Sequence, residues 1–136
     1  MLYNYVGDNM SVDNDFEQRI RSGRLYDFYG GLLTARQQKV MEQHFYNDLS
    51  LGEIAEENGV SRQAIHDLLK RVNSTLERYE AKLGLLARSA KEKEELCQAK
   101  GLLNTYIAEG NIDGRLIKAQ KIILDLSDEG RQTNDF

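Results

Sequence analysis

One short stretch of the sequence gathers side chains that can recognise nucleic acid. If residues 61–83 form a helix, its apolar positions share one sector of about 100°, and polar or basic side chains fill the opposite sector. Glutamine can hydrogen-bond adenine in the major groove, and arginine or lysine can bind phosphate or guanine. The predicted nucleic-acid-binding residues in or beside the polar sector are Ser61, Arg62, Gln63, His66, Lys70 and Arg71.

The residues that lead into this helix follow the pattern of a helix-turn-helix. Ala55 is small enough for two helices to approach closely, and Gly59 follows where the turn needs it. Ile65 then packs the second helix onto the first, and Ile54 and Leu68 complete a small core. An ordinary helical hairpin is the alternative, but the joint fit of these apolar positions favours the helix-turn-helix.

Asp67 lies near the middle of the polar face, where its carboxylate repels phosphate. The formal net charge of the chain is −4, and no segment has the strong basic excess that drives phosphate binding. An acidic protein can still bind nucleic acid if its cations gather on one surface. A second interpretation therefore stays open, in which the helix-turn-helix is retained for protein binding or scaffolding.

Capping residues and glycines place the helices that must position this face. Thr34 and Ser50 each precede a Gln or Glu by three positions, which forms a capping box, and Ser61 caps the helix of the candidate residues. Gly59 and Gly84 mark the ends of helices. Helices are expected over about residues 15–30, 34–47, 50–58, 61–83, 85–109 and 115–127.

The composition predicts an all-α fold, and the motif places a helix-turn-helix in it, followed by a C-terminal helical extension. The chain has no proline, is rich in Leu, Glu, Lys, Arg and Gln, and lacks the β-branched runs that mark strands. The expected organisation is a flexible N-terminal tail over residues 1–14, a helical helix-turn-helix domain over 15–84 and a C-terminal helical extension over 85–130.

The apolar stripe of the long helix continues past the motif through Leu76, Tyr79 and Leu83. Together with the apolar faces of the last two helices, it forms more hydrophobic surface than one small domain easily covers. The sequence therefore predicts a homodimer built mainly by residues 76–127.

Other chemistry has no signature in the sequence. His44 and His66 lie far apart and, with the lone Cys97, give no metal-ligand spacing. There is no glycine-rich phosphate loop, and the acidic residues are scattered over polar helix faces. We therefore expect no enzymatic activity, no metal and no cofactor.

The chain also has the features of a cytoplasmic protein. No apolar run approaches the roughly 18 residues of a membrane span. The first residues lack the basic start and the apolar block of a signal peptide, and a single cysteine fits a reducing compartment. A cytoplasmic location without membrane contact is therefore expected.

From Leu33 to Leu83 the sequence resembles region 4 of bacterial sigma-70-type factors, the module that reads promoter DNA. The resemblance rests on LTARQQKVMEQHFYNDLSLGEIAEENGVSRQAIHDLLKRV, with its opening helix, its SLGEIA helix and its VSRQAI start of the recognition helix. LYDFYGGLLTARQ, DLSLGEIAEE and SRQAI are more similar still to the YlxM family of small bacterial helix-turn-helix proteins. That resemblance extends over roughly residues 16–130.

The resemblance implies a helix-turn-helix of the winged-helix-like class without a wing, in a regulatory protein that binds nucleic acid through Ser61, Arg62, Gln63, His66 and Lys70. It also implies a role in or beside the signal recognition particle pathway, so that partners include DNA, the particle's RNA, and the particle's protein or its receptor. The alternative is a protein-binding accessory factor of that particle that does not bind DNA. Sigma-factor recognition helices are richer in Arg and Lys, so promoter recognition of the sigma kind is not implied.

Overall fold

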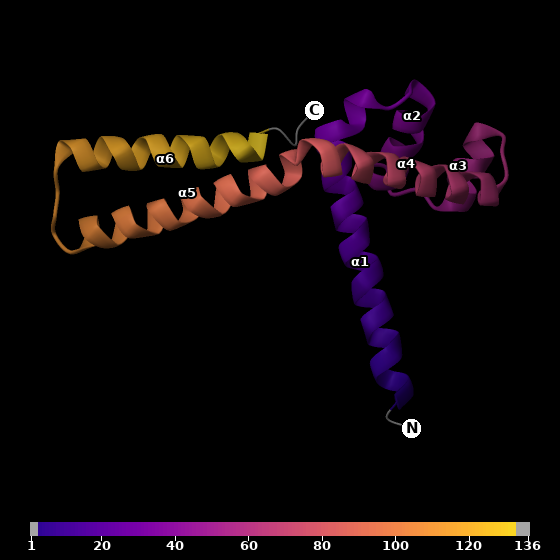
Figure 1. Ribbon diagram of the computed structural model, residues 1–136, viewed down its shortest axis with the longest axis horizontal. Helices are drawn as coiled ribbons and strands as arrows, with labels where there is room; N and C mark the ends of the chain where they lie inside the picture. Colours follow the sequence, from indigo (N-terminus) through magenta and orange to yellow (C-terminus); the bar gives the residue numbers. More distant parts are fainter. Residues whose placement is uncertain (1–2, 133–136) are drawn as a thin grey trace. The chain divides into compact units, whose positions relative to one another are not determined.

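The computed structural model describes the backbone of residues 3–132 and the side chains of residues 14–128 (Figure 1). The helices are α1 (Tyr3–Tyr29), a short 3₁₀ helix η1 (Gly30–Leu32), α2 (Ala35–Phe45), α3 (Leu51–Asn58), α4 (Arg62–Leu83), α5 (Leu85–Ala108) and α6 (Gly114–Gln132). No strand occurs among the described residues, and the predicted all-α class is confirmed. The chain divides into two compact units, Met1–Leu86 and Ala87–Phe136.

The helix-turn-helix lies in the first unit and consists of α3 and the first half of α4. Helix α3 ends at Gly59, whose backbone adopts the left-handed conformation with φ 65° and ψ 33°. Ser61 then caps α4, because its side chain accepts a hydrogen bond from the backbone N–H of Ala64. The buried core between these helices and α2 consists of Val40, Ile54, Ala55 and Ile65.

A second core cluster joins α1 to the far half of α4. Leu25 and Tyr29 of α1 pack with Val72 and Leu76 of α4, and all four side chains are almost completely buried. Tyr79 packs against the same cluster. The first helix therefore covers Leu76 completely and Tyr79 in part, whereas Leu83 at the end of the stripe stays exposed. Leu76 is not available to the dimer surface that the sequence predicts.

Two segments are more helical than the sequence predicts. Residues 3–14, expected to belong to a flexible tail, are part of α1, and α6 continues beyond Ser127 to Gln132. Extending a helix avoids the cost of nucleating a new one, and the chain has no proline to interrupt either segment. Residues 1–2 of the expected N-terminal tail, and residues 133–136 at the other end of the chain, lie outside the described residues.

The two compact units divide slightly beyond the boundary that Gly84 suggests. Gly84 does end α4, in the left-handed conformation with φ 62°. Leu86, however, packs against the core of the first unit, so the first residues of α5 stay with that unit.

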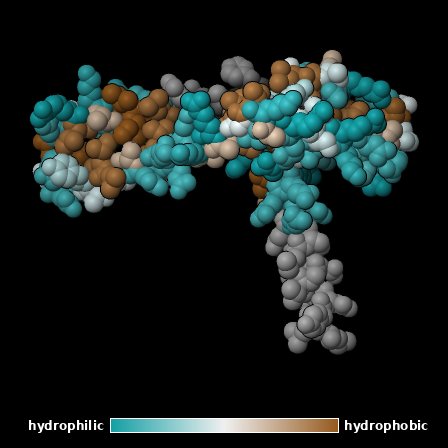
Figure 2. All heavy atoms as spheres, in the orientation of Figure 1, coloured by the Kyte–Doolittle hydropathy of each residue, from teal (hydrophilic) through white to brown (hydrophobic). Residues whose placement is uncertain are grey.

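The second unit is a hairpin of two antiparallel helices, formed by α5 from Ala87 onward and by α6 (Figure 1). The amide of Gln120 donates a hydrogen bond of 2.7 Å to Asn104 across the hairpin. None of its described side chains is buried. Figure 2 shows hydrophobic surface over this hairpin, and its exposed apolar side chains include Leu102, Tyr106, Ile112, Ile117 and Ile122.

The homodimer stays a prediction, and the hairpin is now its expected surface. Leu102 is 74% exposed, and covering it with a second copy removes apolar surface from water. Light scattering should report a dimer for the wild type at a protein concentration on the order of tens of micromolar. At that concentration a dimer with a micromolar Kd is mostly associated. Leu102→Lys should be monomeric, whereas Leu32→Lys, an equally drastic change at an exposed position of the first unit, should stay dimeric. A monomeric wild type at that concentration would contradict the prediction.

The left-handed turn at Gly59 can be tested with a matched pair of alanine substitutions. No atom lies within 4 Å of the position that a Cβ on Gly59 would occupy, so the cost of Gly59→Ala is conformational, about 1–2 kcal/mol. Gly52→Ala, in the body of α3, meets only an ordinary contact and should keep or raise the melting temperature. Equal effects of the two substitutions on thermal unfolding would refute the role of the turn.

Candidate nucleic-acid interface

Main-chain hydrogen bonds fix the turn between α3 and α4. The N–H of Gly59 donates to the carbonyl of Glu56, and the N–H of Val60 donates to the carbonyl of Ala55 at 3.1 Å. Val60 also packs against the core of the helix pair. These bonds satisfy the carbonyl groups at the end of α3 and thereby fix where α4 begins.

The six predicted residues lie on α4 or at its cap, and all six are exposed. The Ser61 hydroxyl is occupied, since it accepts a hydrogen bond of 3.0 Å from the N–H of Ala64. Arg62 and Lys70 form no hydrogen bond or ion pair through their side chains with the residues that the structure describes. Their cationic groups are therefore available to a ligand, although their role in binding stays a prediction.

Asp67 is the hydrogen-bonding centre of this face. Its carboxylate accepts a hydrogen bond of 3.1 Å from the Gln63 amide and lies 3.6 Å from Nδ1 of His66. Nε of Arg71 donates to the backbone carbonyl of Asp67 at 3.4 Å. Asp67, in the middle of the face, therefore engages the amide of Gln63, the side chain that the sequence predicts to contact bases.

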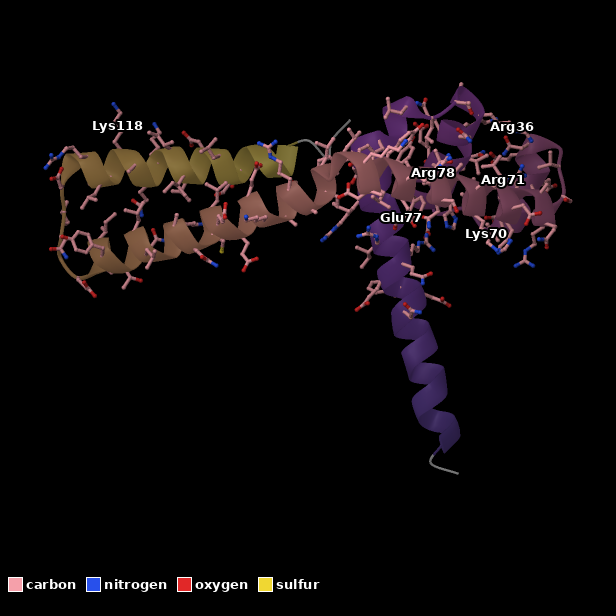
Figure 3. All side chains as sticks on the ribbon, in the orientation of Figure 1. Arg36, Lys70, Arg71, Glu77, Arg78 and Lys118 are labelled. Carbon is pink, nitrogen blue, oxygen red and sulfur yellow. The ribbon has the colours of Figure 1, made fainter. Side chains whose placement is uncertain are left out.

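A second acid of α4, Glu77, is paired by a residue outside the motif. The guanidinium group of Arg21 on α1 donates two hydrogen bonds to the Glu77 carboxylate, at 2.7 and 2.9 Å. These hydrogen bonds lower the pKa of Glu77 and raise the pKa of Arg21 from their ordinary values. Glu77 follows Lys70 by about two helical turns (Figure 3), so the pairing neutralises an acid on the Lys70 side of α4.

Glu80, the third acid of α4, is held against the end of α1. Its carboxylate accepts hydrogen bonds from the Tyr29 hydroxyl at 2.5 Å and from the N–H of Leu86 at 3.1 Å. The Tyr29 hydroxyl accepts a further bond of 3.1 Å from the N–H of Leu85. Burial, and then the bond to Glu80, raise the pKa of Tyr29. Every acid of α4 is thus engaged.

The sequence does not reveal two arginines that belong to this surface. Arg21 reaches Glu77 across 56 positions of the chain. Arg36 of α2 lines a groove together with Arg71 of α4. No spacing rule links either pair, because the packing of α1 and α2 on α4 brings them together. The only local signal near Arg36 is the capping box that begins at Thr34.

The described residues contain no group of three or more His, Cys, Asp and Glu side chains that could hold a metal ion. Over the same part of the chain, no helix combines the length and apolar character that crossing a membrane requires. The single cysteine, Cys97, is exposed and free.

The turn geometry, the two caps and the buried helix pair define a helix-turn-helix protein. Residues 16–112 match the family UPF0122, described as "Putative helix-turn-helix protein, YlxM / p13 like". The match covers more than half of the chain, and the chain belongs to this YlxM-like family. The resemblance to the YlxM family is thereby confirmed over residues 16–112.

Relatives from several bacteria are similar to this chain. A UPF0122 protein of Desulforamulus reducens is 51% identical over 82 residues, which are 60% of this chain and 70% of the relative. The UPF0122 protein YlxM of Bacillus subtilis is 41% identical over 106 residues, 78% of this chain and 96% of the relative. A UPF0122 protein of Halalkalibacterium halodurans is 50% identical over 84 residues, 62% of this chain and 77% of the relative.

The Arg21–Glu77 pair predicts a small, pH-dependent contribution to stability. Its side chains are 51% and 40% exposed, so Arg21→Gln should lower the free energy of unfolding by less than about 1 kcal/mol at neutral pH. Because the pKa of Glu77 is lowered in the folded state, the contribution is present above its unfolded pKa and is lost as the pH falls through the folded value.

Urea denaturation at about pH 7 and about pH 2–3 checks this prediction. Wild type and Arg21→Gln should differ at neutral pH and converge in acid. Arg88→Gln, which removes a more exposed pair with Glu92 in the second unit, is the control and should not change the unfolding of the first unit. A difference that persists in acid would show that Arg21 acts through something other than Glu77.

Proposed function

We propose that this protein is a regulatory helix-turn-helix protein that binds nucleic acid through the exposed face of α4. The observation that carries the proposal is that, in the part of the chain that the structure describes, cationic side chains on this face are unpaired while a nearby acid is paired. Arg62 and Lys70 are exposed and have no partner among the described residues, whereas Glu77 is neutralised by Arg21. An acidic chain can in this way present the local cationic surface that phosphate binding requires.

Each predicted residue has a role that its position allows. Arg62, Lys70 and Arg71 bind phosphates, and Ser61 fixes the first turn of α4 as its cap. Gln63 and His66 face the bases, where a glutamine amide can pair with adenine. To make that contact, the Gln63 amide gives up its hydrogen bond to the Asp67 carboxylate and forms hydrogen bonds to the base instead.

Membership of the YlxM-like family supports a candidate pathway for this activity. The resemblance to that family implies a role in or beside the signal recognition particle pathway, and the particle's RNA is a polyanion like DNA. We therefore propose duplex DNA and the particle's RNA as ligands of the same face of α4. The place of action that we propose is the cytoplasm.

One observation favours a second candidate, a protein-binding accessory factor of the same particle. Asp67 holds the Gln63 amide and places a carboxylate at the centre of the face. A central carboxylate weakens phosphate binding but suits a protein partner that offers a complementary cation. The partner in this case is the particle's protein or its receptor.

The two candidates differ in a titration of labelled duplex DNA and of the particle's RNA, at low and near-physiological salt. If α4 binds nucleic acid, Lys70→Ala weakens binding to all sequences and Gln63→Ala mainly relaxes sequence preference. Asp67→Asn tightens binding because it removes a negative charge from the face. The contacts of Arg62, Lys70 and Arg71 alone should give a salt dependence that corresponds to about two to four phosphates per subunit.

Lys118→Ala is the matched control for Lys70→Ala. Lys118 of α6 is an exposed lysine without an ion-pair partner in the described part of the chain (Figure 3), and its loss should leave both affinities unchanged. Failure of the wild type and of Asp67→Asn to bind either nucleic acid would refute the proposal. Nuclease-resistant association with the particle's purified protein would then support the accessory factor.

A further inference from the structure

A groove beside the recognition helix carries two arginines. It lies between the start of α2 and α4, has a volume of about 320 Å³, and is lined by Thr34, Arg36, Gln37, Ala64, Leu68 and Arg71. Thr34 and Gln37 are engaged with each other in the capping box of α2. The guanidinium groups of Arg36 and Arg71 remain as donors for a ligand.

Neither guanidinium group has a carboxylate partner among the described residues. Arg36 forms no hydrogen bond or ion pair there through its side chain. Arg71 donates only from Nε, at 3.4 Å, to the carbonyl of Asp67 in its own helix. The Nη donors of both arginines are therefore available, and paired donors of this kind are what arginine offers to phosphate.

The cationic surface continues along α4 past the helix-turn-helix. Arg71, Arg78 and Lys82 are spaced by seven and four positions, which places them on one side of the helix over about 16 Å. Figure 3 shows Lys70 and Glu77 on the side of α4 opposite to Arg36.

The acids of this part of α4 point elsewhere. Glu77 binds Arg21 and Glu80 binds Tyr29, so both carboxylates face α1. Within α4, the residues between Arg71 and Arg78 on that side are Ser74 and Thr75, neither of which carries a carboxylate. Nη2 of Arg78 donates to the hydroxyl of Thr75 at 3.3 Å, a neutral contact that leaves its charge unopposed.

We propose that Arg36 and Arg71 clamp one backbone phosphate, and that Arg78 and Lys82 extend the contact along the same nucleic-acid strand. This proposal rests on the proposed function and adds a surface about 100° around α4 from Lys70. A recognition helix in a major groove has a phosphate backbone along its flank, so the clamp fixes the register of the duplex while the central face meets the bases. The ligand chemistry is the phosphodiester backbone of DNA or RNA.

Three variants that each remove one positive charge test the clamp: Arg36→Gln, Arg78→Gln and, as the matched control, Lys118→Gln. The probes are labelled duplex DNA of two unrelated sequences and a labelled duplex RNA. Each clamp variant should weaken binding to both DNA sequences equally, by about eightfold at about 0.1 M salt, because one phosphate contact contributes about 0.9 to the slope of log K against log salt. Lys118→Gln should bind like the wild type.

All three side chains are exposed, so the variants should fold normally. Their melting temperatures should agree with that of the wild type within about 2 °C. The salt slope gives a second readout, since each clamp variant should lower it by about 1 relative to the wild type.

Lys70→Ala and Gln63→Ala separate the clamp from the proposed function. Loss of affinity in Lys70→Ala, with full affinity in Arg36→Gln and Arg78→Gln, overturns the clamp and leaves the proposed function intact. Loss of affinity in the two clamp variants, without effects of Lys70→Ala and Gln63→Ala, supports the clamp and overturns base reading by α4. If Arg36→Gln and Arg78→Gln weaken binding to the RNA probe alone, the clamp binds the phosphates of RNA. If the wild type binds no probe, both proposals are overturned.

Discussion

The packing of α1 on the far half of α4 is the contact on which the candidate interface depends. Leu25 and Tyr29 bury Val72 and Leu76 and so support α4 well beyond the helix-turn-helix. Burial of large apolar side chains stabilises by roughly 1.5–3 kcal/mol each, whereas a single N-cap contributes about 1 kcal/mol. The caps therefore define where α4 begins and ends, and the α1 contact supplies most of the stabilisation of its far half.

The same contact sets the electrostatics of α4. Helix α1 brings Arg21 to Glu77 and Tyr29 to Glu80, so two acids are held on the side of α4 that faces α1. The cations Lys70, Arg71 and Arg78 stay exposed. This separation arises from packing and not from composition, which is why a chain with a formal net charge of −4 can carry a cationic surface.

Local signals predicted the helices and the turn well, because they depend on residues only a few positions apart. The capping boxes at Thr34 and Ser50 are both present, and Gly59 has the left-handed conformation that its place in the motif requires. The partner of the apolar stripe could not be predicted, since the first helix, the C-terminal helices and a second subunit each offer apolar residues that could cover it. The sequence also could not predict the pairing of Arg21 with Glu77 or the groove that Arg36 and Arg71 line together. Each depends on how separate helices pack.

If α4 binds nucleic acid as proposed, affinity and selectivity have different physical sources. Arginines on the flank attract any phosphate backbone, whereas the centre of the face carries the bond between Gln63 and Asp67. An exposed bond between residues four apart on a helix contributes only about 0.2–0.5 kcal/mol, so a base edge that offers better partners can displace it. Asp67 can then accept from the amino group of cytosine, while Gln63 pairs with adenine. A non-matching site leaves the repulsion of Asp67 uncompensated, so the acid that lowers overall affinity raises the ratio of specific to non-specific binding.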